Sequence, residues 1–327
     1  MGHRFKKTFT MKPVSKIVSI ALLSFTSGQA SSANFQLGDV DISFDSTFSA
    51  GTSIRVENRD WSNRVGKSNN PRNGFDFSNF NPAAAFPSNS DVWDGAGSYS
   101  TNGDNGNLNF DAGEAFSTII KGSHELDVRY ENFGIFVRGM YFYDFEMSDS
   151  DRAWTNPASG VTHDPCRDDE ASDQVCSDIR LLDAFVYADF DIGDMPLSIK
   201  VGQQVISWGE STLISHGISE LNAVDIARLR APGSELKEAF IPYGAVWASL
   251  GVTDTFSVEA FYQYSWEKTV LPTPGSYFST NDFAGDGGQY ANVQLGFAGG
   301  ADMDLDFLLS ELNGIGAAMR SGTLPAS

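Results

Sequence analysis

The sequence predicts an all-β protein, an antiparallel transmembrane β-barrel of about seven or eight strands with a short helical C-terminal tail. Three observations predict this fold: an N-terminal export signal, long segments in which apolar and polar residues alternate, and connections that are short and long in turn. No segment after residue 33 holds eighteen consecutive apolar residues, so no later helix is expected to cross a bilayer.

Residues 1–33 are predicted to be a secretory signal peptide. Five basic residues and no acidic residue accompany a mostly apolar run over 17–25, and small residues follow, with cleavage expected near Ala30 or Ala33. The apolar run is only about half of the roughly twenty residues that a membrane-spanning helix needs. The chain is therefore expected to be exported, and its location is predicted to be the outer membrane.

The strands are predicted from a period of two in the hydropathy. Over 40–56 every even position from Val40 onward belongs to one largely apolar face, and the odd positions are polar or small. Strands of soluble proteins usually have about five or six residues, so this length favours a membrane barrel over a secreted β-sandwich, the alternative interpretation. Further strands are predicted over 116–130, 135–145, 182–190, 197–205, 246–252, 256–266 and 290–298.

The connections between these segments alternate in length, as they do in outer-membrane barrels with periplasmic turns and extracellular loops. Short turns are predicted at 132–134, 193–196 and 253–255, and long polar loops at 57–115, 147–178, 209–239 and 268–289.

His124 is the residue that fits a membrane barrel least, because it would face lipid near the middle of its strand.

The polar faces of the strands are expected to line the barrel lumen. Their mixed charges indicate either a cation-preferring lumen or cross-strand ion pairs that fill the interior. The candidate lumen-facing residues are Asp41, Asp45, Arg55, Lys121, Glu125, Asp127, Arg129, Arg138, Asp183, Lys200 and Glu259. On the apolar face, an aromatic girdle is predicted from Tyr141, Tyr143, Phe145, Tyr262, Tyr264 and Trp266.

A loop segment and an apolar stripe are two further features that could occupy the predicted barrel lumen. Segment 209–239 has apolar residues at mixed helical spacing, which indicates either a constriction helix that folds inward or a helix on the surface, and the surface helix is favoured. An inward apolar stripe could guide a hydrophobic solute or pack against an infolded loop. It consists of Phe136, Met140, Phe142, Phe185 and Phe261.

The formal charge of −20 excludes nucleic acid as a partner, because phosphate binding needs a basic surface. The expected partners are outer-membrane lipid and lipopolysaccharide, together with a possible hydrophobic or small polar solute. Cys166 and Cys176 are predicted to form a disulfide in the oxidising compartment, and the alternative is two free thiols. His163 alone cannot complete a zinc site.

No catalytic, cofactor-binding or metal-binding residues are predicted. Ser211, within 209–211 and near His216, lacks the Gly-x-Ser-x-Gly turn of a hydrolase nucleophile. Residues 104–114 miss the spacing of a calcium loop because Gly106 occupies a ligand position.

Several stretches resemble a proteobacterial outer-membrane family catalogued as domain of unknown function 1302. The resemblance covers about residues 34–290, and it implies no catalytic residues. It is carried by residues 106–111, 132–134, 136–139, 141–146, 201–211 and 228–238.

Family members are longer than this chain, which adds to signs of truncation within the sequence. Residues 301–327 are irregular or helical in character, whereas bacterial barrels have an even strand number and generally end on an aromatic strand. The chain is therefore predicted to be the N-terminal part of a larger barrel, with strands and long loops over 34–300. The alternative is a complete eight-stranded barrel with a helical tail.

The function expected of such a chain is passive passage of small or hydrophobic solutes through the outer membrane. A non-transporting surface protein, either an adhesin or a scaffold, is the alternative that the long acidic loops suggest. A non-functional truncated remnant is the third possibility.

Overall fold

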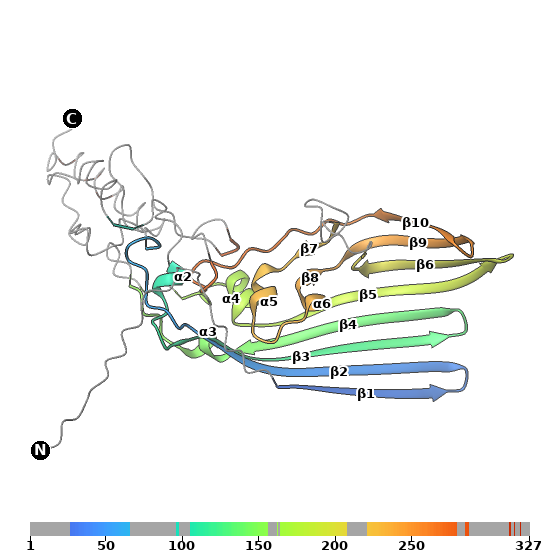
Figure 1. Cartoon of the computed structure of the whole chain (residues 1–327), viewed down its shortest axis with the longest axis horizontal. Coiled ribbons are helices and arrows are strands. Elements are labelled where there is room, and N and C mark those ends of the chain that lie inside the picture. The colour runs from blue at the N-terminus through green and yellow to red at the C-terminus, as the bar shows by residue number, and fades with distance from the viewer. Residues whose placement is uncertain are drawn as a thin grey trace, which may run out of the picture.

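One antiparallel sheet of eight strands organises the protein. The computed structural model describes residues 27–65, 96–97, 105–155, 162, 164–207, 221–279, 285–287, 314, 317 and 321. Within them the strand order is β1-β2-β3-β4-β5-β6-β9-β10, and every neighbouring pair is antiparallel (Figure 1).

The strands of the sheet are long. They are β1 (Ser27–Leu37), β2 (Val40–Ile54), β3 (Ala115–Tyr130), β4 (Phe133–Asp144), β5 (Ser177–Ile192), β6 (Met195–Gln204), β9 (Tyr243–Thr253) and β10 (Phe256–Gln263). The connections contain short elements: α2 (Asn105–Leu108), α3 (Phe145–Asp149), α4 (Asp169–Val175), β7 (Ala223–Val224), α5 (Ile226–Arg230), α6 (Leu236–Ala239) and β8 (Phe240–Ile241).

Seven of these strands match predicted segments, and the eighth is β1. It pairs with β2 from Ser27 opposite Ala50 to Leu37 opposite Val40, and so crosses the predicted cleavage positions. Residues 1–26 of the predicted signal peptide lie outside the described residues, as do the predicted strand 290–298 and most of the tail 301–327. Gly314 and Ala317, within that tail, are helical.

The turns gather at one end of the sheet and the long connections at the other (Figure 1). Gly38 and Gly193, in the β1–β2 and β5–β6 turns, have φ of 63° and 66°, a left-handed conformation that glycine adopts without a Cβ clash. Glu131 makes the β3–β4 turn with φ 53°, which is uncommon for a residue with a side chain. The predicted alternation of short and long connections is therefore present.

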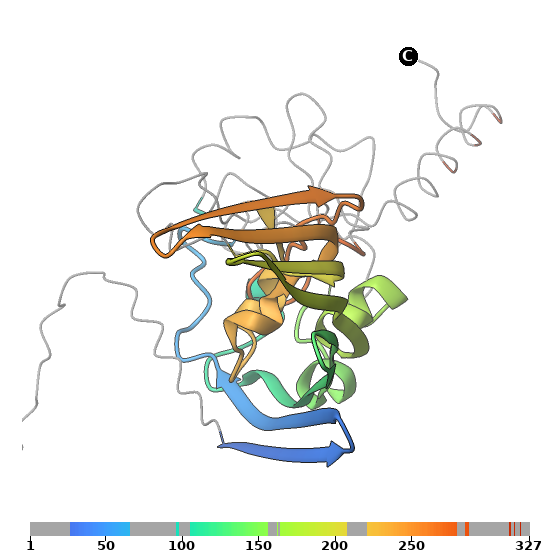
Figure 2. The ribbon, with the colours of Figure 1, turned by 90° about the vertical axis from the view of Figure 1, so that its right-hand side faces the viewer.

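The sheet curves and remains open. Strands β1 and β10 form its two edges and lie on opposite sides of the molecule (Figure 2), and no closed barrel is present in the described parts of the chain. We call the concave side of the sheet, which the charged side chains face, the hollow. Among the described residues, no helix has the length and apolar character needed to cross a membrane.

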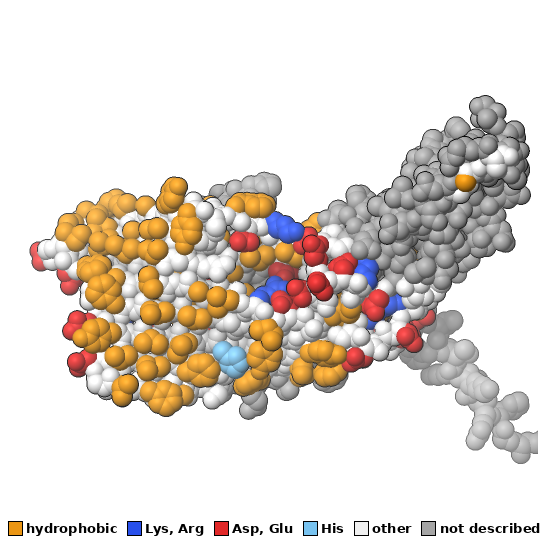
Figure 3. Space-filling model, turned by 180° about the vertical axis from the view of Figure 1, so that it is seen from behind, with side chains coloured by type: hydrophobic (Ala, Val, Ile, Leu, Met, Phe, Trp, Pro, Cys, Tyr) orange, Lys and Arg blue, Asp and Glu red, His pale blue; other side chains and the backbone are white. Residues whose placement is uncertain are grey.

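The two faces of the sheet have the reverse of the usual polarity. Large apolar side chains cover the outer face (Figure 3) and are solvent-exposed, for example Ile179 at 86% and Val186 at 52%. On the face toward the hollow, charged side chains are buried, including Lys121, Arg138 and Asp183. A soluble protein would bury the apolar side chains and expose the charges.

His124 is accommodated on the apolar face by its neighbours. Its Nδ1 lies 2.8 Å from Ser46 Oγ, and its ring stacks on Phe44 with centroids 5.7 Å apart. Phe48 and Tyr141 contact the same ring, at 5.5 and 5.7 Å. The imidazole is therefore hydrogen-bonded and partly covered by aromatic rings, which lowers the cost of a polar group at this position.

Residues of the long connections pack into a cap at the loop end, which comprises the described parts of 105–114, 145–176 and 264–279. Phe110, Phe116 and Met147 form its core, and Tyr277 packs against them. A disulfide joins Cys166 to Cys176, as the sequence predicted. Asn109 Nδ2 donates a hydrogen bond to the Gly275 carbonyl at 2.9 Å, which ties distant segments of the cap together.

Replacement of Cys166 and Cys176 by alanine is expected to loosen the cap without unfolding the sheet. Removal of a disulfide that closes a loop of this length costs roughly 3 kcal/mol of stability, and here the cost falls on the cap. Limited trypsin digestion should cut after Arg167 faster in the variant than in the wild type, while circular dichroism of the sheet stays the same. Equal rates of cleavage in the two proteins would contradict this role of the disulfide.

Candidate functional site in the hollow of the sheet

The charged residues predicted to face inward largely do so, and many pair across strands. Arg138 forms an ion pair with Asp183, and neither side chain is more than 10% exposed. Arg129 Nη2 lies 3.0 Å from Asp189 Oδ2, near the turns. Asp41 stands opposite Arg129 in the register of β2 and β3. The interior is therefore filled in part by cross-strand ion pairs, one of the two predicted readings.

Aromatic side chains share the inward face with these charges. Lys200 Nζ lies 5.5 Å from the Phe185 ring centroid and 5.1 Å from that of Trp247. Tyr187 donates a hydrogen bond from its hydroxyl to Asp127 Oδ1 at 2.8 Å. Lys200 forms no ion pair among the described residues, so the aromatic rings are its main electrostatic partners there.

Acidic side chains concentrate near the middle of the hollow. Asp45 stands opposite Glu125 on β3, and Glu125 stands opposite Arg138 on β4. Ser43 Oγ lies 3.4 Å from Asp45 Oδ2. This side of the hollow carries two neighbouring carboxylates, which disfavour anions at that point.

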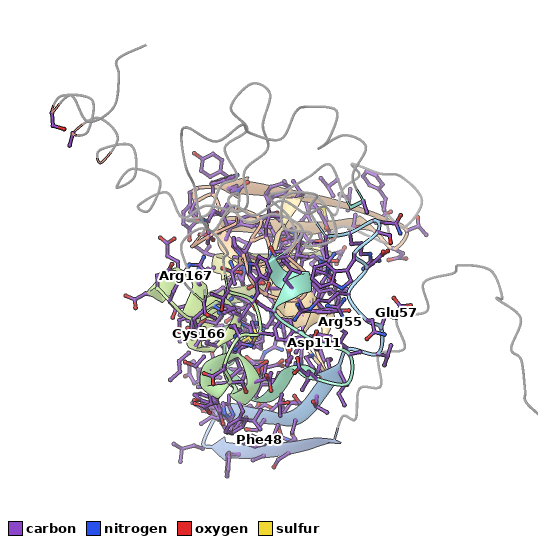
Figure 4. The ribbon with its side chains drawn as sticks, turned by 90° about the vertical axis from the view of Figure 1, so that its left-hand side faces the viewer. Phe48, Arg55, Glu57, Asp111, Cys166 and Arg167 are labelled. Carbon is purple, nitrogen blue, oxygen red and sulfur yellow. A yellow bond between two sulfur atoms is a disulfide. The ribbon has the colours of Figure 1, made fainter. Side chains whose placement is uncertain are left out.

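Two predicted lumen residues differ from the others in their surroundings. Arg55 follows the end of β2, where the alternation stops, and it is buried in the cap rather than in the hollow. It donates hydrogen bonds to the Phe110 carbonyl at 2.8 Å and to Asn107 Oδ1 at 2.6 Å, and it lies near Asp111 (Figure 4). Glu259 stands opposite Ser249 on β9 and shares the inward face with Ser198 and Asp189, but it is exposed because β10 is an edge strand.

Of the predicted girdle residues, Tyr141, Tyr143 and Tyr262 lie in strands of the sheet, and Phe145, Tyr264 and Trp266 follow the ends of β4 and β10. Tyr143 is half-buried, and its hydroxyl donates a hydrogen bond to Asp149 Oδ1 at 3.0 Å. The others are exposed: Tyr141 at 38%, Phe145 at 44%, Tyr262 at 71%, Tyr264 at 55% and Trp266 at 76%.

Residues 222–241, which we call the infolded segment, lie in the hollow (Figure 2). The Asn222 side chain fixes the start of the segment through hydrogen bonds with the backbone of Ile206, at 3.1 and 2.6 Å. Asp225 caps α5 by accepting a hydrogen bond from the Arg228 amide at 2.8 Å. The two-residue strands β7 and β8 pair and close the segment.

Ion pairs hold the infolded segment against the sheet, so the favoured prediction of a surface helix was wrong. The charges of the polar strand face supply the reason, because they gain partners when the segment folds inward. Lys121 and Glu238 have side chains only 3% and 4% exposed. The pairs are Lys121 with Glu238, Lys237 Nζ with Glu125 Oε1 at 2.9 Å, and Arg180 Nη1 with Asp225 Oδ2 at 3.0 Å.

Little in the sequence points to the partners on the infolded segment. Asp225 and Glu238 are ordinary acids in a polar loop, and their partners lie 45 and 117 residues away. Arg180 precedes the predicted start of its strand, because β5 begins at Ser177 rather than 182. Residues 177–181 alternate in the opposite phase to 182–190 because of a register shift opposite Val137 and Gly139, so alternation extended back from 182 would have placed Arg180 outward.

Within the described residues, no group of three or more His, Cys, Asp or Glu side chains is arranged to hold a metal ion. Ser211, His216 and His163 lie outside the described residues. The described part of the hollow presents paired charges, aromatic rings and a segment held by ion pairs.

Glu238→Ala is expected to release the infolded segment. It leaves the Lys121 ammonium buried without its carboxylate partner, with the Ser234 hydroxyl 3.5 Å away, which costs about 3–5 kcal/mol and favours opening. Hydrogen exchange of residues 222–241 and trypsin cleavage after Arg228 or Lys237 should both accelerate. The double variant Lys121→Met, Glu238→Leu removes both charges and should restore protection; unchanged exchange in Glu238→Ala would refute the role of the pair.

Comparison with known proteins places the chain in a family. The family model described as a protein of unknown function, DUF1302, matches residues 14–324. Neither the search of curated proteins nor the search of solved structures found a match. The family match spans most of the chain, including the sheet, the infolded segment and the cap. The chain therefore belongs to the DUF1302 family.

Proposed function

We propose that this chain forms part of the wall of an outer-membrane β-barrel, with the hollow as an aqueous path for passive passage of small or hydrophobic solutes. The reversed polarity of the sheet carries the proposal. Exposed Ile179 and Val186 on one face and buried Lys121 and Arg138 on the other suit lipid outside and water inside. Strands of 10 to 16 residues, such as β6 and β3, match the roughly 9–11 residues needed to cross a bilayer.

Closure of the wall is part of the proposal. The outer edges of β1 and β10 carry backbone groups that need hydrogen-bond partners in a membrane, where an unpaired group costs several kcal/mol. We propose that further strands pair with these edges and complete a larger barrel, of which the described sheet is one part. The hollow then becomes the lumen.

The infolded segment would narrow this path and set its selectivity. Lys237 neutralises Glu125, while Asp45 and Asp41 have no ion pair among the residues that the structure describes. These free carboxylates, together with the acidic chain as a whole, favour cations over anions. A lumen narrowed by α5 and α6 suits small solutes rather than large ones.

Reconstitution of the protein into planar lipid bilayers tests the proposal. Stepwise conductance with a preference for cations is expected, and Asp45→Asn should lower the cation-to-anion permeability ratio because it removes a lumenal charge. Asp254→Asn, in the exposed β9–β10 turn, is the matched control and should leave that ratio unchanged. Folded, inserted protein that conducts no ions and passes no small solute would overturn the proposal.

The cap favours a second candidate function, that of a surface adhesin or scaffold. A disulfide and an aromatic core around Phe110 give the loop end a packed surface, more than simple passage needs. Cells that carry the Cys166→Ala, Cys176→Ala variant should then lose adhesion to a surface that wild-type cells bind. Adhesion that is independent of the cap would rule out this candidate.

A further inference from the structure

A small cavity lies where the infolded segment meets β3, β4 and the cap. Its volume is about 60 Å³, enough for a few water-sized groups. Apolar and aromatic side chains form most of its wall: Phe116, Phe142, Met147, Tyr277 and Phe278. Polar and charged side chains also line it: Ser117, Asp144, Gln174, Arg228, Arg230 and Ser276. A cavity of this composition can hold a short apolar group and one polar end.

Arg228 brings a buried guanidinium that forms no direct ion pair to this cavity. The side chain is 1% exposed, and its guanidinium carbon lies 3.5 Å from the Phe142 ring centroid. Nη2 donates a hydrogen bond to the backbone carbonyl of Gln174 at 3.1 Å, whereas Nε has no hydrogen-bond partner in the described part of the chain. None of the ion pairs found there includes Arg228. A buried cation that no carboxylate contacts directly is costly, and although the more distant Asp225, Asp178 and Glu238 attract it, the site favours an anion.

The acids around Arg228 already have other partners. Asp225 Oδ2 pairs with Arg180, and Oδ1 accepts the backbone amide of Arg228 itself. Asp144, on the cavity wall, accepts hydrogen bonds from the Thr118 amide at 3.0 Å and the Ser117 hydroxyl at 2.5 Å. Neither carboxylate is therefore available to neutralise the guanidinium directly.

Gln174 supplies a second unused donor. The residue is 5% exposed, and neither atom of its side-chain amide has a hydrogen-bond partner among the described residues. An unpaired buried amide costs about 1–3 kcal/mol, which a bound polar group would recover. Two buried side chains at one cavity thus have hydrogen-bonding capacity to spare.

We propose that this cavity binds the carboxylate of a small apolar monocarboxylate. A carboxylate can accept hydrogen bonds from Arg228 Nε and from the Gln174 amide, and the carbon chain contacts Phe116 and Tyr277. The aromatic wall favours a carboxylate with a carbon chain over an inorganic anion. The inference also names a class of solute that the proposed path would carry, and in that respect it rests on the proposed function.

Ligand-observed NMR titration of the purified full-length protein in detergent tests the site, with butyrate as the probe and butyramide as its neutral isostere. Butyrate is expected to bind about fivefold or more tightly than butyramide, because only butyrate gains charge-assisted hydrogen bonds. Arg228→Met should remove this preference. The matched control is Arg64→Met at an exposed arginine, which should keep it.

Equal binding of butyrate and butyramide, retention of the preference in Arg228→Met, or complete displacement of butyrate by equimolar chloride would each overturn the inference. Gln174→Leu, which removes no charge, provides a second variant if Arg228→Met does not fold, and it should weaken butyrate binding severalfold. A protein that conducts ions but does not bind butyrate would contradict only this inference. A protein that binds butyrate but passes no solute would contradict only the proposed function.

Discussion

Strict alternation of side chains along unusually long strands is the constraint on which the rest of the structure depends. Because successive residues point to opposite faces, β2 to β5 place apolar side chains outside and charged ones in the hollow. Charges gathered in this way must find partners, and they do so across strands, as Arg138 does with Asp183. The apolar outer face has no protein partner among the described residues, which is why lipid is its proposed neighbour.

The infolded segment follows from the same constraint. Its acids and lysine pair with charges on the inward face of the strands, and these ion pairs hold it against the sheet. Buried ion pairs add little net stability, but they are costly to break one partner at a time. They therefore fix the position of α5 and α6. Arg228 is the exception, since it is carried inward with the segment and stacks on Phe142 without an ion pair.

Local pattern predicted much of the fold, and non-local contacts account for what it missed. Seven strands, their turns and the Cys166–Cys176 disulfide could be read from periodicity, turn residues and compartment. Strand β1 was missed because its small and polar residues alternate weakly beside an export signal. A register shift opposite Val137 and Gly139 buries Leu182, which simple alternation placed outside. The position of the infolded segment depends on pairs such as Lys121 with Glu238, which spacing cannot reveal.

Site-directed spin labelling along residues 184–188 of β5, in the protein reconstituted into lipid vesicles, tests the central claim most directly. Accessibility to oxygen, which concentrates in lipid, should peak at outward positions such as Val186 and fall at inward positions such as Tyr187. A water-soluble nickel complex should show the opposite pattern. Outward positions that are open to the nickel complex and shielded from oxygen would contradict a lipid-facing wall.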